Sequence, residues 1–413
     1  MLNIKHIPRS MILWLYSLSN ILFCFVYFFS GSLGSDYDGY IVYFPYTLLY
    51  CLVLVLSSFF ILHAVFKFFE KINMAKSYKV STDSTVIHYF IFIILSIAFT
   101  FSIVYGYGRV GNENSLAPSF VSLFNKFLVP QYLLYCYIAI FYDSKRIIYF
   151  VNLLVFVLFN FYKGYTFIIL VIGFLWVFRI LSSGKSISWK MIFLLVFLLL
   201  ISPLVRLLKN VVLYSIGSDD ASMAESMQII ISNRNGDSNF SLYIDFLLRT
   251  FERFESVSAT YYIVDNKDIL STMYEDHNFL PFYLYHWIPQ TLEKILSYNS
   301  IYDITQVYAQ RYIAGFYNPY YVWQTHIGYF GWPIINPEGM IFYYLYSVAL
   351  MFLLVFISQH FTSNKGLLEM SWILTILYMG HGWFNDYIIF IQALVVMYVL
   401  LLFVGFFKRF SNE

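Results

Sequence analysis

This chain of 413 residues is poor in charged residues and in cysteine. Charged residues make up 12% of it, against about 25% in soluble globular domains. We therefore exclude a soluble globular fold. The three cysteines, Cys24, Cys51 and Cys136, all fall in apolar segments, so no disulfide framework holds the polar part of the chain together.

Motifs that bind nucleotides or metals are also lacking. The absence of a Walker loop and of an HExxH motif argues against an ATP-driven pump and a zinc protease. A GxGxxG pattern at 106–111 follows an apolar run rather than a strand, so we interpret it as a flexible turn. The net charge of +2 indicates no particular partner. We expect no metal, no cofactor and no nucleic acid partner.

Apolar and aromatic residues are abundant, at 60% and 22% of the chain. Tyr and Trp are favoured at the membrane–water interface, and runs of about 17–25 apolar residues span a bilayer as helices. We therefore predict an all-α, polytopic helical membrane protein with about ten transmembrane helices. The predicted spans are 11–30, 41–66, 86–105, 128–142, 147–161, 165–182, 191–205, 336–357, 367–383 and 388–407.

Residues 147–182 and the N-terminus each allow two interpretations. Residues 147–182 form either one kinked span or two spans that turn at Tyr162–Tyr165. Two spans agree better with the charges, because a single span would place Lys185 and Lys190 outside. The basic N-terminus resembles a signal peptide, but no small-residue cleavage site follows, so we expect an uncleaved first helix.

The distribution of charge predicts the orientation. Cytoplasmic flanks collect Lys and Arg, and one set of flanks holds fourteen basic and five acidic residues, whereas the opposite set holds eleven and eighteen. We expect both termini to be cytoplasmic. The predicted organisation is helices 1–7 in residues 1–205, one large external loop with short helices in 206–335, and helices 8–10 with a short tail in 336–413.

The external loop contains a segment, 240–255, with helical spacing of charged residues. On a helix, Asp245, Arg249 and Arg253 share one face, and two guanidinium forks one turn apart can clamp a diphosphate. The alternative is an Asp245–Arg249 pair on a solvated face. Leu247, Phe251 and Phe254 would form an apolar stripe on the opposite side. Further external cations that could converge on the same site are Arg206, Lys209, Arg234 and Arg311.

Two other parts of the loop are aromatic. Residues 278–296 are broken by prolines and too short to span, so we expect an amphipathic segment on the outer leaflet. Ten of the 25 residues from 308 to 332 are aromatic; such rings pack against sugars or anchor loops at the interface. His326 and Glu338 are candidate general bases because both can titrate, and each could instead be structural.

These features resemble the O-antigen (Wzy-type) polymerases and, more distantly, the O-antigen ligases. The similarity covers nearly the whole chain in its architecture of seven spans, a large external loop and three spans. The matching motifs are Arg-x-x-x-Arg-Phe at 249–254, Ile288-Pro289, and Tyr329-Phe330-Gly331-Trp332. Family members often carry an acidic residue shortly before the Phe-Gly, where this chain has Thr325-His326.

The resemblance implies a metal-independent glycosyltransferase on the periplasmic side of the bacterial inner membrane. Its donor would be a growing glycan on undecaprenyl diphosphate, its acceptor one repeat unit on the same lipid, and a chain-length regulator protein a partner. The leaving diphosphate would be stabilised by preorganised arginines. Arg249 and Arg253 would bind it, with Arg234, Arg311 and Arg206 in support, and His326 or else Glu338 would be the base.

Two rivals are an O-antigen ligase, which would use the same donor, and a flippase for the lipid-linked unit. Transporters usually carry polar groups and broken helices at mid-membrane. Here the spans are almost free of charge, with Glu369 near one end of the ninth span and His381 near the other. The polar residues gather in the external loop, which favours an enzyme over a transporter. A structural scaffold would leave the clustered external arginines without a role.

Overall fold

The computed structural model describes residues 7–37, 39–72, 85–110, 112, 116–142, 144–165, 173, 200–212, 225, 227–228, 239–276, 280–295, 325–361 and 365–410. Within these ranges the regular structure is helical, without any strand. Six helical stretches of the described chain are long and apolar enough to cross a membrane. The protein is therefore a helical membrane protein, as its composition predicts.

Most predicted spans coincide with observed helices. These are α1 (Ile7–Ser30), α2 (Pro45–Lys71), α3 (Thr85–Tyr105), α16 (Met340–Phe361) and α18 (Phe384–Phe410). Two shorter apolar helices, α6 (Ile147–Lys163) and α17 (Lys365–Leu374) with its π-helical continuation Thr375–Met379, occupy the fifth and ninth predicted spans. The sixth predicted span and most of the seventh lie outside the described residues, although residues 200–212 are helical.

The fourth predicted span, 128–142, covers only the second half of a broken helix. α4 (Ser119–Leu128) and α5 (Pro130–Phe141) are separated by Val129, which has a φ of 40°. Pro130 is the first residue of α5. Its ring is compatible with the first turn of a helix but would interrupt a continuous helix. Together the two helices form one apolar stretch of 23 residues.

A glycine ends α6 at the turn predicted for Tyr162–Tyr165. Gly164 has a φ of 87°, and its N–H bonds to Phe161 O at 3.0 Å. This left-handed cap suits glycine because a side chain would be strained there. The helix therefore stops after Lys163, and most of residues 166–182, which would distinguish one kinked span from two spans, lie outside the described residues.

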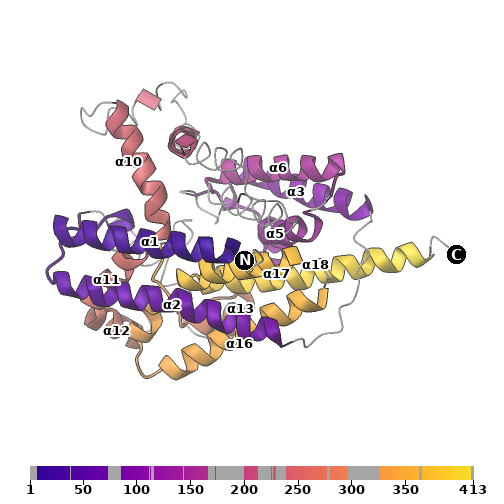
Figure 1. Ribbon diagram of the computed structural model, residues 1–413. Helices are drawn as coiled ribbons and strands as arrows, with labels where there is room; N and C mark the ends of the chain where they lie inside the picture. Colours follow the sequence, from indigo (N-terminus) through magenta and orange to yellow (C-terminus); the bar gives the residue numbers. More distant parts are fainter. Residues whose placement is uncertain are drawn as a thin grey trace.

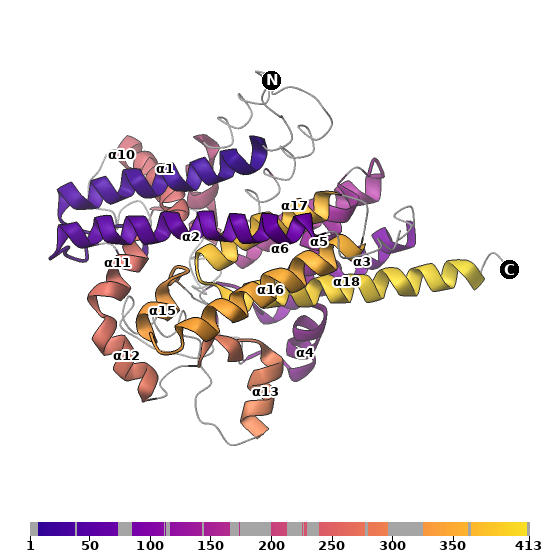
Figure 2. The ribbon, with the colours of Figure 1, turned by 60° about the horizontal axis from the view of Figure 1, so that its bottom comes forward.

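The long helices pack as a bundle. Figures 1 and 2 show α1 and α2 side by side, while α16 packs on α2, α18 on α5 and α16, and α3 on α6. An ion cluster joins three helices at one end. Arg9 of α1 bonds Glu70 of α2 at 2.6 Å and Glu369 of α17 at 2.7 Å, with its guanidinium 5.5 Å from the centre of the Trp372 ring.

Figure 2 shows several shorter helices around the opposite end, where α1 ends and α2 begins, and α13 (Trp287–Ile295) farther along, beside α4. α11 packs against both α2 and α15, and so carries this part of the chain onto the bundle. The short elements are α10 (Asn239–Phe251), the 3-10 turn η4 (Glu252–Phe254), α11 (Val257–Asp265), α12 (Lys267–Glu275), η5 (Phe282–Leu284), α13 (Trp287–Ile295) and α15 (Gly331–Ile335).

Candidate functional site

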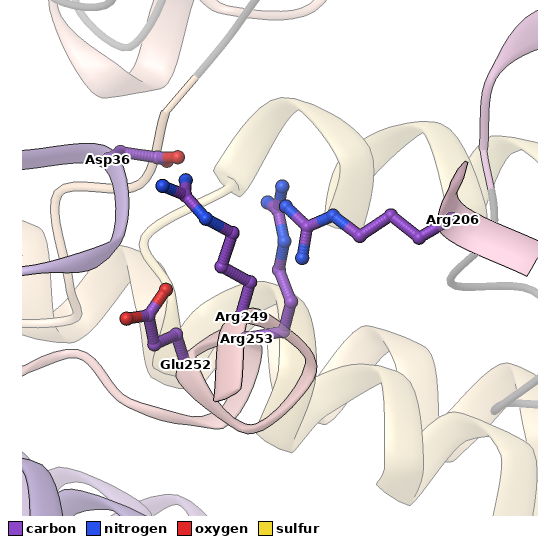
Figure 3. Close-up of a pocket in the computed structure, with 5 residues that line it drawn as sticks. All are labelled: Asp36, Arg206, Arg249, Glu252 and Arg253. Carbon is purple, nitrogen blue, oxygen red and sulfur yellow. The ribbon is translucent and has the colours of Figure 1, made fainter. Parts of the chain in front are cut away.

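Three arginines from two separate segments converge on one pocket. Arg249 and Arg253 come from the end of α10 and from η4, and Arg206 enters from the helical residues 200–212. Figure 3 shows the guanidinium groups of Arg253 and Arg206 close together, while that of Arg249 is directed toward Asp36. Two carboxylates complete the lining: Glu252, and Asp36 from the 3-10 turn η2 (Ser35–Tyr37) between α1 and α2.

The end of α10 is held in place by a buried asparagine of α1. Asn20 Nδ2 donates to Phe254 O at 2.9 Å, and Ser256 N donates to Asn20 Oδ1 at 2.8 Å. The Phe254 ring is buried and meets Tyr16 edge-on, 5.3 Å between centroids. These contacts tighten the last turn into η4, whereas the sequence predicts one regular helix to residue 255.

A buried carboxyl follows η4 at the start of α11. Glu255 accepts hydrogen bonds from Ser258 N at 3.1 Å and from Tyr27 O–H at 3.2 Å. Burial raises the pKa of Glu255 to about 7. The carboxyl satisfies an N–H of the first turn of α11, which otherwise has no intrahelical partner, and ties that turn to α1.

The pocket has more positive than negative charge. Three arginines face two carboxylates, and Lys209 lies close enough for Arg253 and Arg206 to act on it. Burial, reinforced by repulsion from Arg253, lowers the pKa of Arg206 to about 10 and that of Lys209 to about 8. Crowded, partly buried cations of this kind are stabilised by an anion.

Asp36 is charged in this setting. Burial on its own would raise the pKa of its carboxyl, but Arg253, His326 and a hydrogen bond from Thr325 outweigh burial and hold the pKa below its usual range. The Thr325 Oγ1–H donates to Asp36 Oδ2 at 2.8 Å. Asp36 is therefore an oriented, ionised carboxylate at the edge of an arginine pocket.

His326 lies next to Asp36 but does not line the pocket. Its side chain is 5% exposed, and its ring lies 5.1 Å from His381 and 6.2 Å from Trp383, between centroids. Its Nδ1 has no hydrogen-bond partner within the described ranges. Burial, with the neighbouring His381, lowers the pKa of His326, so the ring is neutral near pH 7.

The turn at His381 and Gly382, which follows the π-helical end of α17, joins the segment that carries His326 to η4. His381 O accepts hydrogen bonds from Ile327 N at 3.2 Å and Gly328 N at 3.1 Å, and His381 Nε2 faces Arg253 O at 3.3 Å. Gly382 has a φ of 76°, and a Cβ there would lie 2.6 Å from Gly328 O. Only glycine fits this approach of two backbones.

The structure therefore brings together three of the predicted site residues, Arg206, Arg249 and Arg253. Glu338 is exposed in the turn between α15 and α16 and does not line the pocket. Arg234 and Arg311 lie outside the described residues, as does the side chain of Asp245.

Sequence reasoning missed both carboxylates of the pocket. Glu252 follows Arg249 by three residues, so helical spacing could have identified it. Asp36 stands in a short polar link with no distinguishing pattern, and the sequence contains no signal that relates it to Thr325.

Comparison of this chain with protein-family models, with curated proteins and with solved structures gives no match. A functional assignment therefore depends on the chemistry of the pocket and on its place in the bundle.

Proposed function

We propose that this protein polymerises undecaprenyl-diphosphate-linked oligosaccharide repeat units, as an O-antigen polymerase type of glycosyltransferase. The observation that carries the proposal is the convergence of Arg206, Arg249 and Arg253 in one pocket at the end of the membrane bundle. Guanidinium forks match pairs of phosphate oxygens. A leaving diphosphate gains negative charge in the transition state, which preorganised cations stabilise without a metal ion.

The position of the pocket along the membrane helices suits a substrate attached to a lipid. Asn20, which holds η4, lies ten residues before the end of α1, or about 15 Å along the helix axis. The arginine-bearing turn therefore packs between the ends of membrane helices. A lipid-linked diphosphate could reach these arginines while its hydrocarbon tail stays in the bilayer.

The proposed topology has about ten spans, with the 206–335 loop on the periplasmic side of the bacterial inner membrane and both termini in the cytoplasm. Two sets of contacts support it. Arg9, Glu70 and Glu369 all belong to the flanks predicted as cytoplasmic, and they meet at one end of the bundle. Asp36 and Thr325, both predicted as external, meet at the other.

In the proposed reaction, the hydroxyl of the acceptor unit attacks the anomeric carbon of the donor glycan. The bond from that carbon to the lipid diphosphate breaks, and Arg206, Arg249 and Arg253 hold the departing anion. Each turnover lengthens the glycan by one repeat unit and releases one undecaprenyl diphosphate.

The test uses purified protein in liposomes with the undecaprenyl-diphosphate-linked repeat unit and EDTA. A ladder of products spaced by one repeat unit is the expected result. If no ladder forms, adding lipid A-core tests for a ligase, and a leaflet-exchange assay tests for a flippase; activity in either would replace the present proposal. Arg109→Ala is a matched control, because Arg109 follows α3 on the same side of the bundle but does not line the pocket.

A further inference from the structure

We propose that Asp36 is the general base of the reaction, the group that takes the proton from the acceptor hydroxyl. This inference rests on the proposed function. Asp36 lines the same pocket as the three arginines, although it comes from the link between the first two membrane helices. Figure 3 shows its carboxylate at one edge of the pocket, with Arg249 between it and Arg206.

The carboxylate is oriented for this role. Thr325 donates to Oδ2, and Thr325 is itself held because Trp383 Nε1 donates to its carbonyl at 3.2 Å. Within the described part of the chain, Oδ1 accepts no hydrogen bond. A base must be within hydrogen-bond reach of the proton it removes, and Oδ1 is the oxygen that remains for an incoming hydroxyl.

The position of Asp36 also fits the geometry of displacement. Attack at an anomeric carbon brings the acceptor oxygen in on the side opposite to the leaving group. In Figure 3 the guanidinium of Arg206 lies at the far side of the pocket from Asp36. Asp36 and Arg206 thus lie on opposite sides of the pocket, as the attacking and leaving groups do in a displacement.

The acceptor hydroxyl oxygen forms a bond to the anomeric carbon as its proton moves to Asp36 Oδ1. The bond between that carbon and the diphosphate oxygen breaks, and its electron pair leaves with the diphosphate. Water then removes the proton from Asp36, which restores the carboxylate.

The surrounding charges couple this base to donor binding. In the free protein, Arg253 and Arg206 favour the ionised form of Asp36 and make it a weak base. A bound diphosphate adds negative charge near the carboxylate and offsets the arginines, which raises its affinity for a proton. Asp36 would then become an effective base only when the donor is in place.

The other candidates for the base are less well placed. His326 does not line the pocket, and its ring is in contact with His381 and Trp383. Glu338 is exposed in a different turn. The alternative role for Asp36 is structural, as a counter-charge that keeps Arg249 in position.

Asp36→Asn separates the two roles, because they predict opposite effects on anion binding. If Asp36 is the base, Asp36→Asn removes one negative charge from a pocket that binds an anion. Binding of undecaprenyl diphosphate to the purified variant should then be as tight as in the wild type or several-fold tighter, while transfer falls about 10²–10⁴-fold. Weaker binding would show that Asp36 only positions the arginines, and transfer within tenfold of wild type would exclude it as the base.

Two further variants keep the test decisive. Asp265→Asn is the matched control, because that carboxylate lies at the end of α11, accepts a hydrogen bond from Tyr40 and does not line the pocket; it should change neither binding nor transfer. If Asp36→Asn fails to fold, Thr325→Val leaves the carboxylate in place without its orienting donor. Transfer should then fall about tenfold with binding unchanged, and full activity would contradict the proposal.

The outcome also distinguishes this inference from the proposed function. If the wild-type protein neither binds undecaprenyl diphosphate nor forms polymer, the proposed function fails and the role of Asp36 fails with it. If the wild type is active and Asp36→Asn is equally active, only the role of Asp36 is wrong.

Discussion

Ser256 N donates a hydrogen bond to Asn20 Oδ1 at 2.8 Å, across 236 residues of sequence. The amide of Asn20 is fully buried, and it also donates to the carbonyl of Phe254. These two bonds enclose the turn that carries Arg253. One polar side chain inside the first membrane helix therefore holds the turn that carries Arg253.

Replacing Asn20 with Leu should impair both stability and activity. It leaves Ser256 N–H and Phe254 O buried without partners, which costs about 1–3 kcal/mol each, and it frees η4 to shift. We expect a lower melting temperature in detergent and at least tenfold less polymer per folded molecule. Asn160→Leu is the control, because within the described ranges Asn160 Nδ2 bonds only Phe156 O of its own helix. Unchanged polymer yield in Asn20→Leu would contradict this role.

Arg249→Ala and Arg253→Ala should each abolish polymer while membrane insertion stays intact. Loss of one preorganised donor to a developing anion typically reduces turnover about 10²–10³-fold. Lysine at either position keeps the charge but loses the planar fork, so we expect only partial recovery. The measurements are the product ladder and the amount of protein in the membrane fraction. Normal ladders from both alanine variants would remove the basis of the diphosphate site.

Lys209 should give donor binding a pH dependence. Burial, with repulsion from Arg253 and Arg206, lowers the pKa of Lys209 to about 8, so the ammonium loses its proton as the pH rises from about 7 to 9. An anion binds better to the protonated form. The affinity for undecaprenyl diphosphate should therefore fall several-fold over this range. Lys209→Arg stays charged and should show a flat profile; a profile as steep as that of the wild type would assign the titration to another group.

Arg9→Ala should destabilise the bundle without acting on the pocket directly. The substitution leaves Glu70 and Glu369 facing each other with side chains only 29% and 22% exposed, and removal of one partner from a buried ion pair costs about 3–5 kcal/mol. Thermal melting in detergent micelles measures the effect. Lys67→Ala removes an exposed cation from the same end of α2 and should have little influence. Equal melting temperatures for Arg9→Ala and the wild type would refute a stabilising ion cluster.

Much of the bundle could be predicted, because the thickness of a bilayer fixes the length of an apolar helix. The α4–α5 stretch was only half anticipated. Asn125 and Lys126 lower the hydropathy of its outer part, and Pro130 marks a break that pattern reasoning places at a span boundary. Val129 N donates to Asn125 O and Leu133 N donates to Val129 O, so backbone hydrogen bonds continue across the break, and the two helices form one apolar stretch.

In the candidate site, as in the bundle, local features could be predicted and long-range contacts could not. The arginine pair was predictable because spacing along a helix is a local property of the sequence. The contact between Asp36 and Thr325 was not, because it joins residues 289 positions apart and depends on how the helices pack. The tightening of η4 was missed for the same reason, since its cause lies in Asn20 of α1.

The hydrogen bonds from Ile327 and Gly328 to His381 O have a consequence for biosynthesis. A nascent chain that has emerged from the ribosome as far as α16 already contains Asp36 and all three arginines. It still lacks the carbonyl that fixes the Thr325 loop, and the Gly382 turn against which that loop packs. The pocket proposed as the catalytic centre should therefore assemble only when translation reaches the last membrane helices, so that prematurely terminated products would carry the arginines without the assembled pocket.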